Sequence, residues 1–599
     1  MVGSASPIYA MLATGGGCLK AGRREQTMHY KNMSRRDFLA MAGASVAAFG
    51  EPQWARAART TDDFRSADLV VYNAKIYTVD SRLPRAEAFA VRGNRFLCVG
   101  SSEEIRSLIG KKTATLDAGG MAIVPGFIDS HNHAPGNELL YEVLVGNPYE
   151  VEFVAIADII GKLRAKAQNT PSDTWVEGYF FDDTKVTDKR PLTIHDLDEV
   201  SKDLPVAVYH RGGHTTFYNS KAFAMAGITR ATPDMASGTY DRDTHGDLNG
   251  RVTDNARDVF DKVGRRSTYS PEETLRRDRD GLAYISKQFA RFGLTSVCHE
   301  SGNLHALAQV RERGDLKHRV SYEADGPELE AMITGGMTTG LGDEWIRMGA
   351  TSEHGVDGSF SERTMAMSVP YPGSSTGYKG NVLETQEVLD AWCERVHRAG
   401  IQLNCHANGD VAIEHVLTAY ERALRVLPQR DARPKITHCT LITEDLVRRI
   451  KAIGAVPALF TSYAYYNPDK FHFYGDELMK RCMAFRTLLD AGVPAAAGSD
   501  FDPGPFSPLM GMQGMVTRTG WNGEVWGANQ RIGVGEALRV NTLNGAYATR
   551  EETLKGSITA GKLADFVVLE DDPHTVDPGK IKDIRINRTV VGGTTVYAA

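Results

Sequence analysis

The clearest chemical pattern in the sequence is a histidine pair, His131 and His133, that ends the apolar run 124–133. Alternate residues of an extended strand point to the same side, so both imidazoles can face one ion. Imidazole is the commonest neutral ligand of zinc-like metals. A His-x-His pair on its own is more often an accident of packing than a ligand pair. The metal interpretation therefore depends on partners elsewhere in the chain.

Three later segments each end in a residue that can bind metal. His406, His438 and Asp500 close the apolar segments 403–406, 435–438 and 495–500. Taken singly, each has an ordinary explanation, because histidine is often half-buried and aspartate often caps a helix. Catalytic groups of a (β/α)8 barrel, however, lie at the carboxyl ends of its strands. Ligand-type residues at several strand ends together indicate one metal site.

The segments that must position these residues alternate between helical and strand-like patterns. The helical stretches are 284–292, 387–399, 444–453 and 486–491, and a short apolar run follows each of them. This alternation is typical of an α/β fold, and we predict a (β/α)8 TIM-type barrel over residues 126–554. Residues 137–290 are too long for one loop, so we expect an inserted lobe there, after the first barrel strand.

Both ends of the chain contain short strand-like runs. They are 69–72, 75–78, 88–91, 95–99, 565–569 and 588–597, and Gly93-Asn94 offers a hairpin turn. We predict a small β-sandwich domain built from residues 61–125 and 555–599.

Read in order, these motifs resemble those of the amidohydrolase superfamily, and within it the branch that contains N-substituted formamide deformylase. The matching motifs are 125–133, His406 with Gly409-Asp410, His438, and Gly498-Ser499-Asp500. The resemblance extends from about residue 67 to the C-terminus and includes Asn219-Ser220, Thr232-Pro233-Asp234 and 561–565.

The resemblance implies a role for each matching residue. His131 and His133 would bind one metal ion and His406 and His438 a second, while Asp500 would touch the metal and accept a proton from its water. The implied cofactor is a divalent metal, with zinc preferred, as one or two ions; Mn, Fe and Ni stay open. A divalent ion lowers the pKa of bound water from about 16 toward about 7, which makes hydroxide available to attack a carbonyl.

Two departures from the family pattern bear on the site. Relatives often bridge two ions with a carboxylated lysine placed four residues before an Asp-Gly-Ser, and Glu353 stands at that position here. Its carboxylate offers the same two oxygens on a shorter stem, so we predict a Glu-bridged centre; the alternative is an ordinary surface acid. Relatives often carry Asp-Gly-His where this chain has Gly212-Gly213-His214. His214 keeps the expected role at the substrate carbonyl, where either His214 or a metal would stabilise the oxyanion, and the preceding acid is lost.

The predicted function is hydrolysis of a C–N bond in an amide, N-acyl or formamide-type substrate. Aromatic residues gather at 463–474, where they would either line a pocket for an aromatic or apolar substrate or pack a loop onto the lobe. The same centre also suits a cyclic-amide or lactone hydrolase or a deaminase. A catalytically inactive binding protein on this scaffold is the alternative from another class.

Composition excludes several other classes. The net charge of −6 argues against a nucleic-acid binder, and hydrophobic and charged fractions of 42% and 24% are ordinary for a globular protein. Seven cysteines without a CxxC pair form neither a disulfide framework nor a zinc ribbon. No apolar run reaches the roughly 18 residues of a membrane span. We expect a small-molecule substrate and no stable membrane insertion, and a homo-oligomer stays open.

Residues 1–60 have the pattern of an export signal. Ser34-Arg35-Arg36-Asp37-Phe38-Leu39 precedes the weakly apolar stretch 40–50, and Ala55-Arg56-Ala57 offers a cleavage site. This order resembles a twin-arginine signal, which implies a periplasmic enzyme. The alternatives are a short amphipathic helix on a loose tail and a cytoplasmic enzyme whose signal is not used. Met33 directly precedes the motif and is a candidate start.

Overall fold

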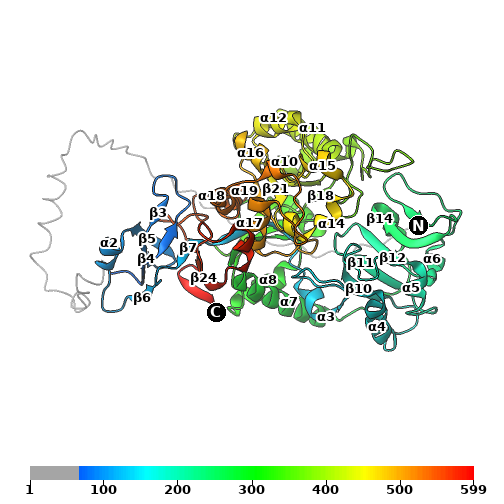
Figure 1. The fold of residues 1–599 in the computed structure, drawn as a ribbon, viewed down its shortest axis with the longest axis horizontal. Coiled ribbons are helices and arrows are strands. Elements are labelled where there is room, and N and C mark those ends of the chain that lie inside the picture. Colours follow the sequence, from blue (N-terminus) through cyan, green and yellow to red (C-terminus); the bar gives the residue numbers. More distant parts are fainter. Residues whose placement is uncertain (1–65) are drawn as a thin grey trace, which may run out of the picture. The chain divides into compact units, whose positions relative to one another are not determined.

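The computed structural model describes residues 66–599, which form a mixed α/β structure (Figure 1). The predicted export signal lies outside the described residues.

Strands from both ends of the chain form two adjoining sheets. The first sheet, in the order β5-β4-β1-β6, contains β1 (Leu69–Tyr72), β4 (Ala88–Arg92), β5 (Arg95–Gly100) and β6 (Ala114–Asp117). The second, in the order β25-β24-β23-β7-β2-β3, contains β2 (Lys75–Tyr77), β3 (Arg85–Ala86), β7 (Ala122–Pro125), β23 (Phe566–Leu569), β24 (Ile586–Val591) and β25 (Thr594–Ala598). One hydrophobic cluster, which includes Val71, Phe89, Ile123 and Phe566, joins residues of both sheets. Strands from both chain ends thus lie in one sheet, in which β23 pairs with both β7 and β24, and Figure 1 shows β7 and β24 in the same region.

Glycine turns define two hairpins in these sheets. Gly93 has a φ of 61° and turns β4 into β5, as the Gly93-Asn94 pair predicts. The run 588–597, read as one strand from the sequence, is a hairpin instead. Gly592 and Gly593 have φ values of 56° and 75°, a conformation that glycine adopts without steric cost, and the chain reverses there between β24 and β25.

The centre of the molecule consists of two parallel sheets. One has the order β17-β16-β15-β8, from β8 (Phe127–Asn132), β15 (Leu294–Glu300), β16 (Arg319–Ala324) and β17 (Ile346–Thr351). The other has the order β18-β19-β20-β21-β22, from β18 (His354–Gly355), β19 (Asn404–Ala407), β20 (Lys435–His438), β21 (Val456–Phe460) and β22 (Ala496–Gly498).

Backbone contacts connect these two sheets at both edges. A parallel bridge joins Ala350 to Gln402. At the other edge, Asp500 N donates to His131 O and His133 N donates to Phe501 O, both over 3.0 Å. The carboxyl ends of the first and last parallel strands therefore lie side by side.

Helices connect the parallel strands and have the predicted alternation. They include α7 (Pro271–Arg291), α8 (Leu304–Glu312), α9 (Gly326–Gly335), α10 (Gln386–Arg398), α11 (Asp410–Val426), α12 (Glu444–Ile453) and α16 (Phe485–Asp490). The local signals explain their bounds. In α12 the Thr443 hydroxyl caps the first turn, and Gly454 ends the helix with a φ of 67°. The helix predicted at 444–453 is confirmed.

The chain between β8 and α7 builds a sheet of its own. Its order is β13-β14-β12-β11-β10-β9, from β9 (Val143–Leu144), β10 (Val176–Phe181), β11 (Val206–His210), β12 (Thr215–Tyr218), β13 (Tyr240–Arg242) and β14 (Leu248–Thr253). Helices α3 (Gly136–Tyr141), α4 (Ile156–Ala167), α5 (Ile194–Asp198) and α6 (Ser220–Ala226) accompany it. Two hydrophobic clusters of its own stabilise this region, called the lobe below. Helix α7 instead contributes Ile285 and Phe289 to the core of the parallel sheets.

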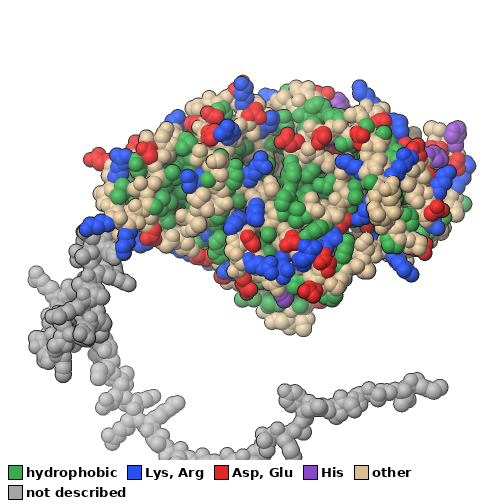
Figure 2. All heavy atoms as spheres, turned by 90° about the horizontal axis from the view of Figure 1, so that it is seen from below, with side chains coloured by type: hydrophobic (Ala, Val, Ile, Leu, Met, Phe, Trp, Pro, Cys, Tyr) green, Lys and Arg blue, Asp and Glu red, His purple; other side chains and the backbone are tan. Residues whose placement is uncertain are grey.

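Acidic and basic side chains are interspersed on the face drawn in Figure 2 and do not gather into a patch of one sign. Within residues 66–599, no helix is both long and apolar enough to cross a bilayer.

Candidate metal centre

The four predicted histidines meet at the carboxyl ends of the parallel strands. The His131 ring centroid lies 5.1 Å from that of His133 and 5.2 Å from that of His438. His406 Nδ1 lies 2.9 Å from His438 Nε2. Three of the four side chains are buried, whereas that of His133 is 37% exposed. Of the four histidines, only His133 is therefore exposed to solvent.

Two carboxylates lie among these imidazoles. Asp500 Oδ1 is 3.0 Å from both His131 Nε2 and His133 Nε2. Glu353 Oε2 lies 3.1 Å from His438 Nε2, 3.3 Å from His406 Nδ1 and 3.6 Å from His131 Nε2. All six predicted metal-site residues are thus brought into one cluster.

Local backbone strain holds two members of the cluster. His438 and Asp500 have φ values of 71° and 53°, in the left-handed region that residues other than glycine seldom adopt. Such a conformation costs about 1 kcal/mol or more and persists where the surrounding structure holds it in place. Strain at these strand ends turns functional side chains toward a common point.

The donor set fits a divalent cation. His131, Glu353, His438 and Asp500 each offer one ligand atom, and these atoms all lie within 4.8 Å of one another. Glu353 Oε2 is buried, and no donor within residues 66–599 is aligned to hydrogen-bond to it. Buried carboxylate oxygens normally have a partner. A metal ion bound by imidazole nitrogens and carboxylate oxygens would supply one.

The charges of the cluster favour the same conclusion. Burial alone lowers the pKa of His131, but the carboxylates of Glu353 and Glu300 raise it well above its usual value. In the same way, burial opposes and Asp500 favours protonation of His133, whose pKa is raised to about 9. The neighbouring imidazoles hold the pKa of Glu353 well below its usual value, against the effect of burial. The carboxylates are anionic and attract positive charge, which a metal ion can provide in place of protons.

Glu300 is a site residue that the sequence analysis missed. In the structure Glu300 Oε1 lies 2.9 Å from His131 Nδ1, and Glu300 Oε2 accepts hydrogen bonds from Glu353 N (2.9 Å) and from the Ser352 hydroxyl. This carboxylate fixes the ring that presents Nε2 to the cluster. The signal was available, because a carboxylate ends a predicted parallel strand.

His214 lies beside the cluster with a carboxylate partner of its own. Its ring centroid is 5.0 Å from that of His406, and its Nδ1 lies 2.8 Å from Asp254 Oδ1. Asp254 Oδ2 accepts a hydrogen bond from Asn381 Nδ2 over 2.6 Å. This arrangement places the ring proton on Nδ1 and leaves Nε2 available for a substrate.

A second carboxylate takes the place of the acid that the family pattern has before Gly-His. A Cβ atom on Gly212 would lie only 2.0 Å from Glu362 Oε1, so the Glu362 carboxylate occupies the space that a side chain at position 212 would need. Glu362 Oε1 accepts a hydrogen bond from His214 N over 3.1 Å, and its Oε2 lies 3.4 Å from His210 Nδ1. Sequence reasoning could not pair Glu362 with Gly212, because the two residues are 150 positions apart.

The aromatic run at 463–474 serves mainly in packing. Tyr463 stacks on Phe460, which in turn stacks on His438, with centroid distances of 3.9 and 4.4 Å. Tyr466, Phe471 and Tyr474 are buried. Tyr465 and Phe473 are only partly buried, and Phe473 lines a crevice described below.

Two solved structures share the fold of this chain. An uncharacterized metal-dependent hydrolase from Pyrococcus horikoshii OT3 matches with a TM-score of 0.66 at 21% identity, covering 85% of this chain and 99% of that one. A second such hydrolase, from Pyrococcus furiosus, matches with a TM-score of 0.62 at 22% identity, covering 85% and 100%.

The sequence comparison identifies the family. The model of the amidohydrolase family matches residues 114–597, so the chain belongs to this family. It is accordingly an enzyme, a hydrolase that acts on carbon–nitrogen bonds, and the predicted resemblance is confirmed. N-substituted formamide deformylase of Arthrobacter pascens is 27% identical over 551 residues, which are 88% of this chain and 98% of that protein. The protein LONG AFTER FAR-RED 3 of Arabidopsis thaliana is 25% identical over 551 residues, which are 89% and 92% of the two chains.

Proposed function

We propose that this enzyme hydrolyses the C–N bond of an amide, N-acyl or formamide-type substrate with a divalent metal, zinc in the first place. The residues that would hold the metal are His131, His133, Glu353, His406, His438 and Asp500. One observation carries the proposal: the buried Glu353 Oε2, without an aligned donor, lies 3.1–3.6 Å from three imidazole nitrogens. The formamide deformylase among the relatives supports the choice of bond.

When bound, the divalent ion would lower the pKa of water from about 16 toward about 7 and polarise a carbonyl group. Asp500 is the proton acceptor in this proposal. Its carboxylate is held anionic by the imidazoles of His438, His131 and His133, despite burial that opposes the charge. It would take a proton from water at Oδ and deliver it to the leaving nitrogen.

His214 is proposed to stabilise the negative charge that develops on the carbonyl oxygen. Asp254 Oδ1 accepts a hydrogen bond from His214 Nδ1 and fixes the orientation of the ring, whose Nε2 would donate to the carbonyl oxygen. Asn381 holds the Asp254 carboxylate from the other side. The donor is thus fixed before the substrate arrives, which is what electrostatic stabilisation of a transition state requires.

The proposed scaffold is a (β/α)8 barrel over residues 126–554, with an inserted lobe at about 137–290 and a β-sandwich from residues 61–125 and 555–599. The bridge between Ala350 and Gln402 and the bonds at His131 and His133 support closure of the two parallel sheets. The hydrophobic cluster shared by the end sheets supports the sandwich. We also propose export to the periplasm, supported by the twin-arginine pattern at 34–39.

Metal analysis combined with an activity panel tests the function. We expect purified enzyme to contain zinc or another divalent ion, and anomalous scattering to locate it beside Glu353. We expect Glu353→Gln to lose part of that metal. In a panel of formamides, N-acyl amines, cyclic amides, lactones and aminopurines, release of amine and acid from the first two classes would support the proposal. Ammonia from aminopurines would favour a deaminase instead. A protein that binds neither Zn nor Mn would be an accessory binding protein.

A further inference from the structure

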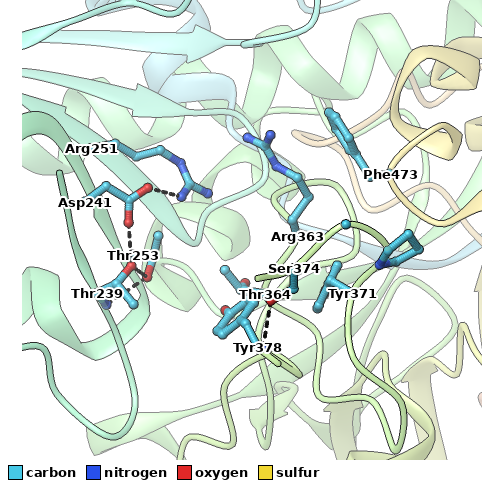
Figure 3. A pocket seen from close by; sticks show the side chains of 12 residues that line it. Thr239, Asp241, Arg251, Thr253, Arg363, Thr364, Tyr371, Ser374, Tyr378 and Phe473 are labelled. Atoms are coloured by element: carbon cyan, nitrogen blue, oxygen red, sulfur yellow. Dashed lines mark hydrogen bonds and ion pairs between the residues drawn. The ribbon is translucent and has the colours of Figure 1, made fainter. Parts of the chain in front are cut away.

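A crevice of about 520 Å³ lies between the lobe and the segment 363–378 (Figure 3). Arg251, together with Asp241 and two threonines, lines it from the lobe. Arg363, the stacked rings of Tyr371 and Tyr378, and Phe473 line the other side. The crevice combines guanidinium groups, hydroxyls and aromatic rings, which is a set that can recognise both charge and a flat apolar body.

The crevice adjoins the groups that hold His214. Two pairs of consecutive residues separate the two regions. Thr253 lines the crevice while Asp254 binds His214, and Arg363 lines the crevice while Glu362 accepts a bond from His214 N. Asp254 and Arg363 have φ values of 45° and 65°, and such strained positions of non-glycine residues gather at functional sites. The crevice and the groups that hold His214 therefore share two short backbone segments, 253–254 and 362–363.

The two arginines differ in how far they are already satisfied. Arg251 forms an ion pair with Asp241 at 2.7 Å and donates to Glu362 O over 2.8 Å. The guanidinium of Arg363 makes a single hydrogen bond within residues 66–599, from Nη2 to Asp183 over 2.8 Å. Arginine has five N–H donors, so most of those on Arg363 stay available.

The carboxylate partner of Arg363 is itself shared. Asp183 Oδ1 also lies 3.3 Å from His210 Nε2 and 4.0 Å from Lys470 Nζ. Arg251 is balanced by Asp241, so the charge of Arg363 gives the crevice a positive balance. The Arg363 guanidinium lies 4.3 Å from the centroid of the Phe473 ring, which holds it in place. A carboxylate is the group that a fixed guanidinium binds best.

We propose that the crevice binds a small molecule with a flat, aromatic body and one carboxylate, and that the carboxylate pairs with Arg363. The rings of Tyr371, Tyr378 and Phe473 would contact the flat body, and nearby hydroxyls would orient it. We assign the bound group to the non-reacting end of the amide substrate, and this assignment rests on the proposed function. Binding itself does not depend on that function.

Titration of the metal-loaded enzyme with benzoate, followed by ligand-observed NMR, tests the proposal. Benzamide has the same shape without the charge and serves as the matched probe. We expect saturable benzoate binding that weakens by about tenfold or more in Arg363→Met, because a charged hydrogen bond is lost. Arg230→Met is the control variant, because Arg230 pairs with Asp247 on the exposed surface of the lobe. It should leave binding unchanged, and benzamide should bind more weakly than benzoate.

Phe473→Leu provides a second variant that keeps the charge and removes the stacking ring, and it should also weaken benzoate binding. The proposal is overturned if wild type does not bind benzoate, or if Arg363→Met and Phe473→Leu both bind it as wild type does. The latter result would assign the benzoate to the metal centre.

Turnover of N-formyl amines with and without a carboxylate separates this proposal from the proposed function. We expect the carboxylated compounds to have the lower KM and to lose that advantage in Arg363→Met. Hydrolysis of amides without any dependence on Arg363 would remove the crevice proposal and leave the function. Arg363-dependent benzoate binding without amide hydrolysis would remove the proposed function and keep the crevice proposal. The crevice would then bind a carboxylate ligand other than the substrate.

Discussion

Two buried clusters in this enzyme contain the same residue types but differ in what balances their charge. One is the candidate metal centre, with Glu353 and Asp500 among four histidines. The other joins the lobe to the loop after β21 and contains Asp182, Asp183 and His210. Both have oxygen and nitrogen atoms close enough together to hold a cation.

In the second cluster the chain supplies the cation itself. Lys470 Nζ lies 3.1 Å from Asp182 Oδ1, and Lys185 Nζ lies 3.4 Å from Asp182 Oδ2, with both lysines buried. Burial alone raises the pKa of Asp182, but these two ammonium groups hold it well below its usual value. The metal centre has no lysine or arginine paired with Glu353 or Asp500 among the described residues. The presence or absence of an internal cation, more than residue type, distinguishes the candidate metal centre from the second cluster.

The largest difference between the clusters should be catalytic. Asp500→Asn removes the proposed proton acceptor and should lower kcat by about 10²- to 10⁴-fold, with metal content nearly unchanged. The matched variant in the other cluster, Asp182→Asn, should lower stability and leave kcat as it is. Steady-state kinetics with elemental analysis of both variants measures this. Full activity of Asp500→Asn would remove its assigned role.

The sequence was sufficient for the parts of the fold that repeat a local pattern. The helix at 444–453 has a capping threonine, an apolar face and a closing glycine, and each of these signals is local. The hairpin at Gly592-Gly593 was missed because the run 588–597 was read as continuous, although a Gly-Gly pair between two β-branched runs is a local turn signal. The lobe was expected only from the length of the chain between motifs, and the order of its strands had no local signal.

The residues of the candidate site also fall into those that the sequence could predict and those that it could not. His131, His133, His406, His438 and Asp500 follow apolar strands, and so their convergence could be expected. Asp254 and Glu362 could not be assigned, because each acts on a histidine far away in the sequence. Glu300 ends a parallel strand and could have been assigned from that position. The contact between Glu362 and the space beside Gly212 exists only in three dimensions.

The second largest effect should be on stability, in the lysine-balanced cluster. Lys470→Met leaves Asp182 and Asp183 without one of their cations in a buried place, which typically costs about 3–5 kcal/mol. Lys480→Met is the control, because Lys480 forms an exposed pair with Glu477 and should change stability by less than about 1 kcal/mol. Urea unfolding of the three proteins compares them. Equal stability of Lys470→Met and wild type would mean that the cluster does not need its internal cation.

A buried histidine pair without any carboxylate gives a third case. His299 Nε2 lies 2.9 Å from His318 Nε2, and burial lowers the pKa of His299 to about 4. The unfolded chain binds a proton near pH 6.5, so it holds more protons than the folded state between about pH 6.5 and 4. The free energy of unfolding should therefore fall as the pH drops through this window, by about 3 kcal/mol for His299.

Unfolding of wild type and His299→Gln at several pH values isolates that contribution. The variant should show a flatter dependence on pH over the same window. Parallel profiles of the two proteins would mean that His299 has the same pKa in the folded and unfolded states, so that burial without a carboxylate does not keep it neutral.

The smallest expected effect concerns the carboxylate that orients His131. Glu300→Gln keeps the shape of the side chain and one hydrogen-bonding oxygen but removes the charge beside His131 Nδ1. Loss of such a partner typically lowers metal affinity by about 10- to 100-fold. Competition with a chelator of known affinity measures the change, and Glu551→Gln, whose buried carboxylate pairs with Lys555, serves as the matched buried control. Equal losses in both variants would mean that burial of charge, and not orientation of His131, sets the affinity.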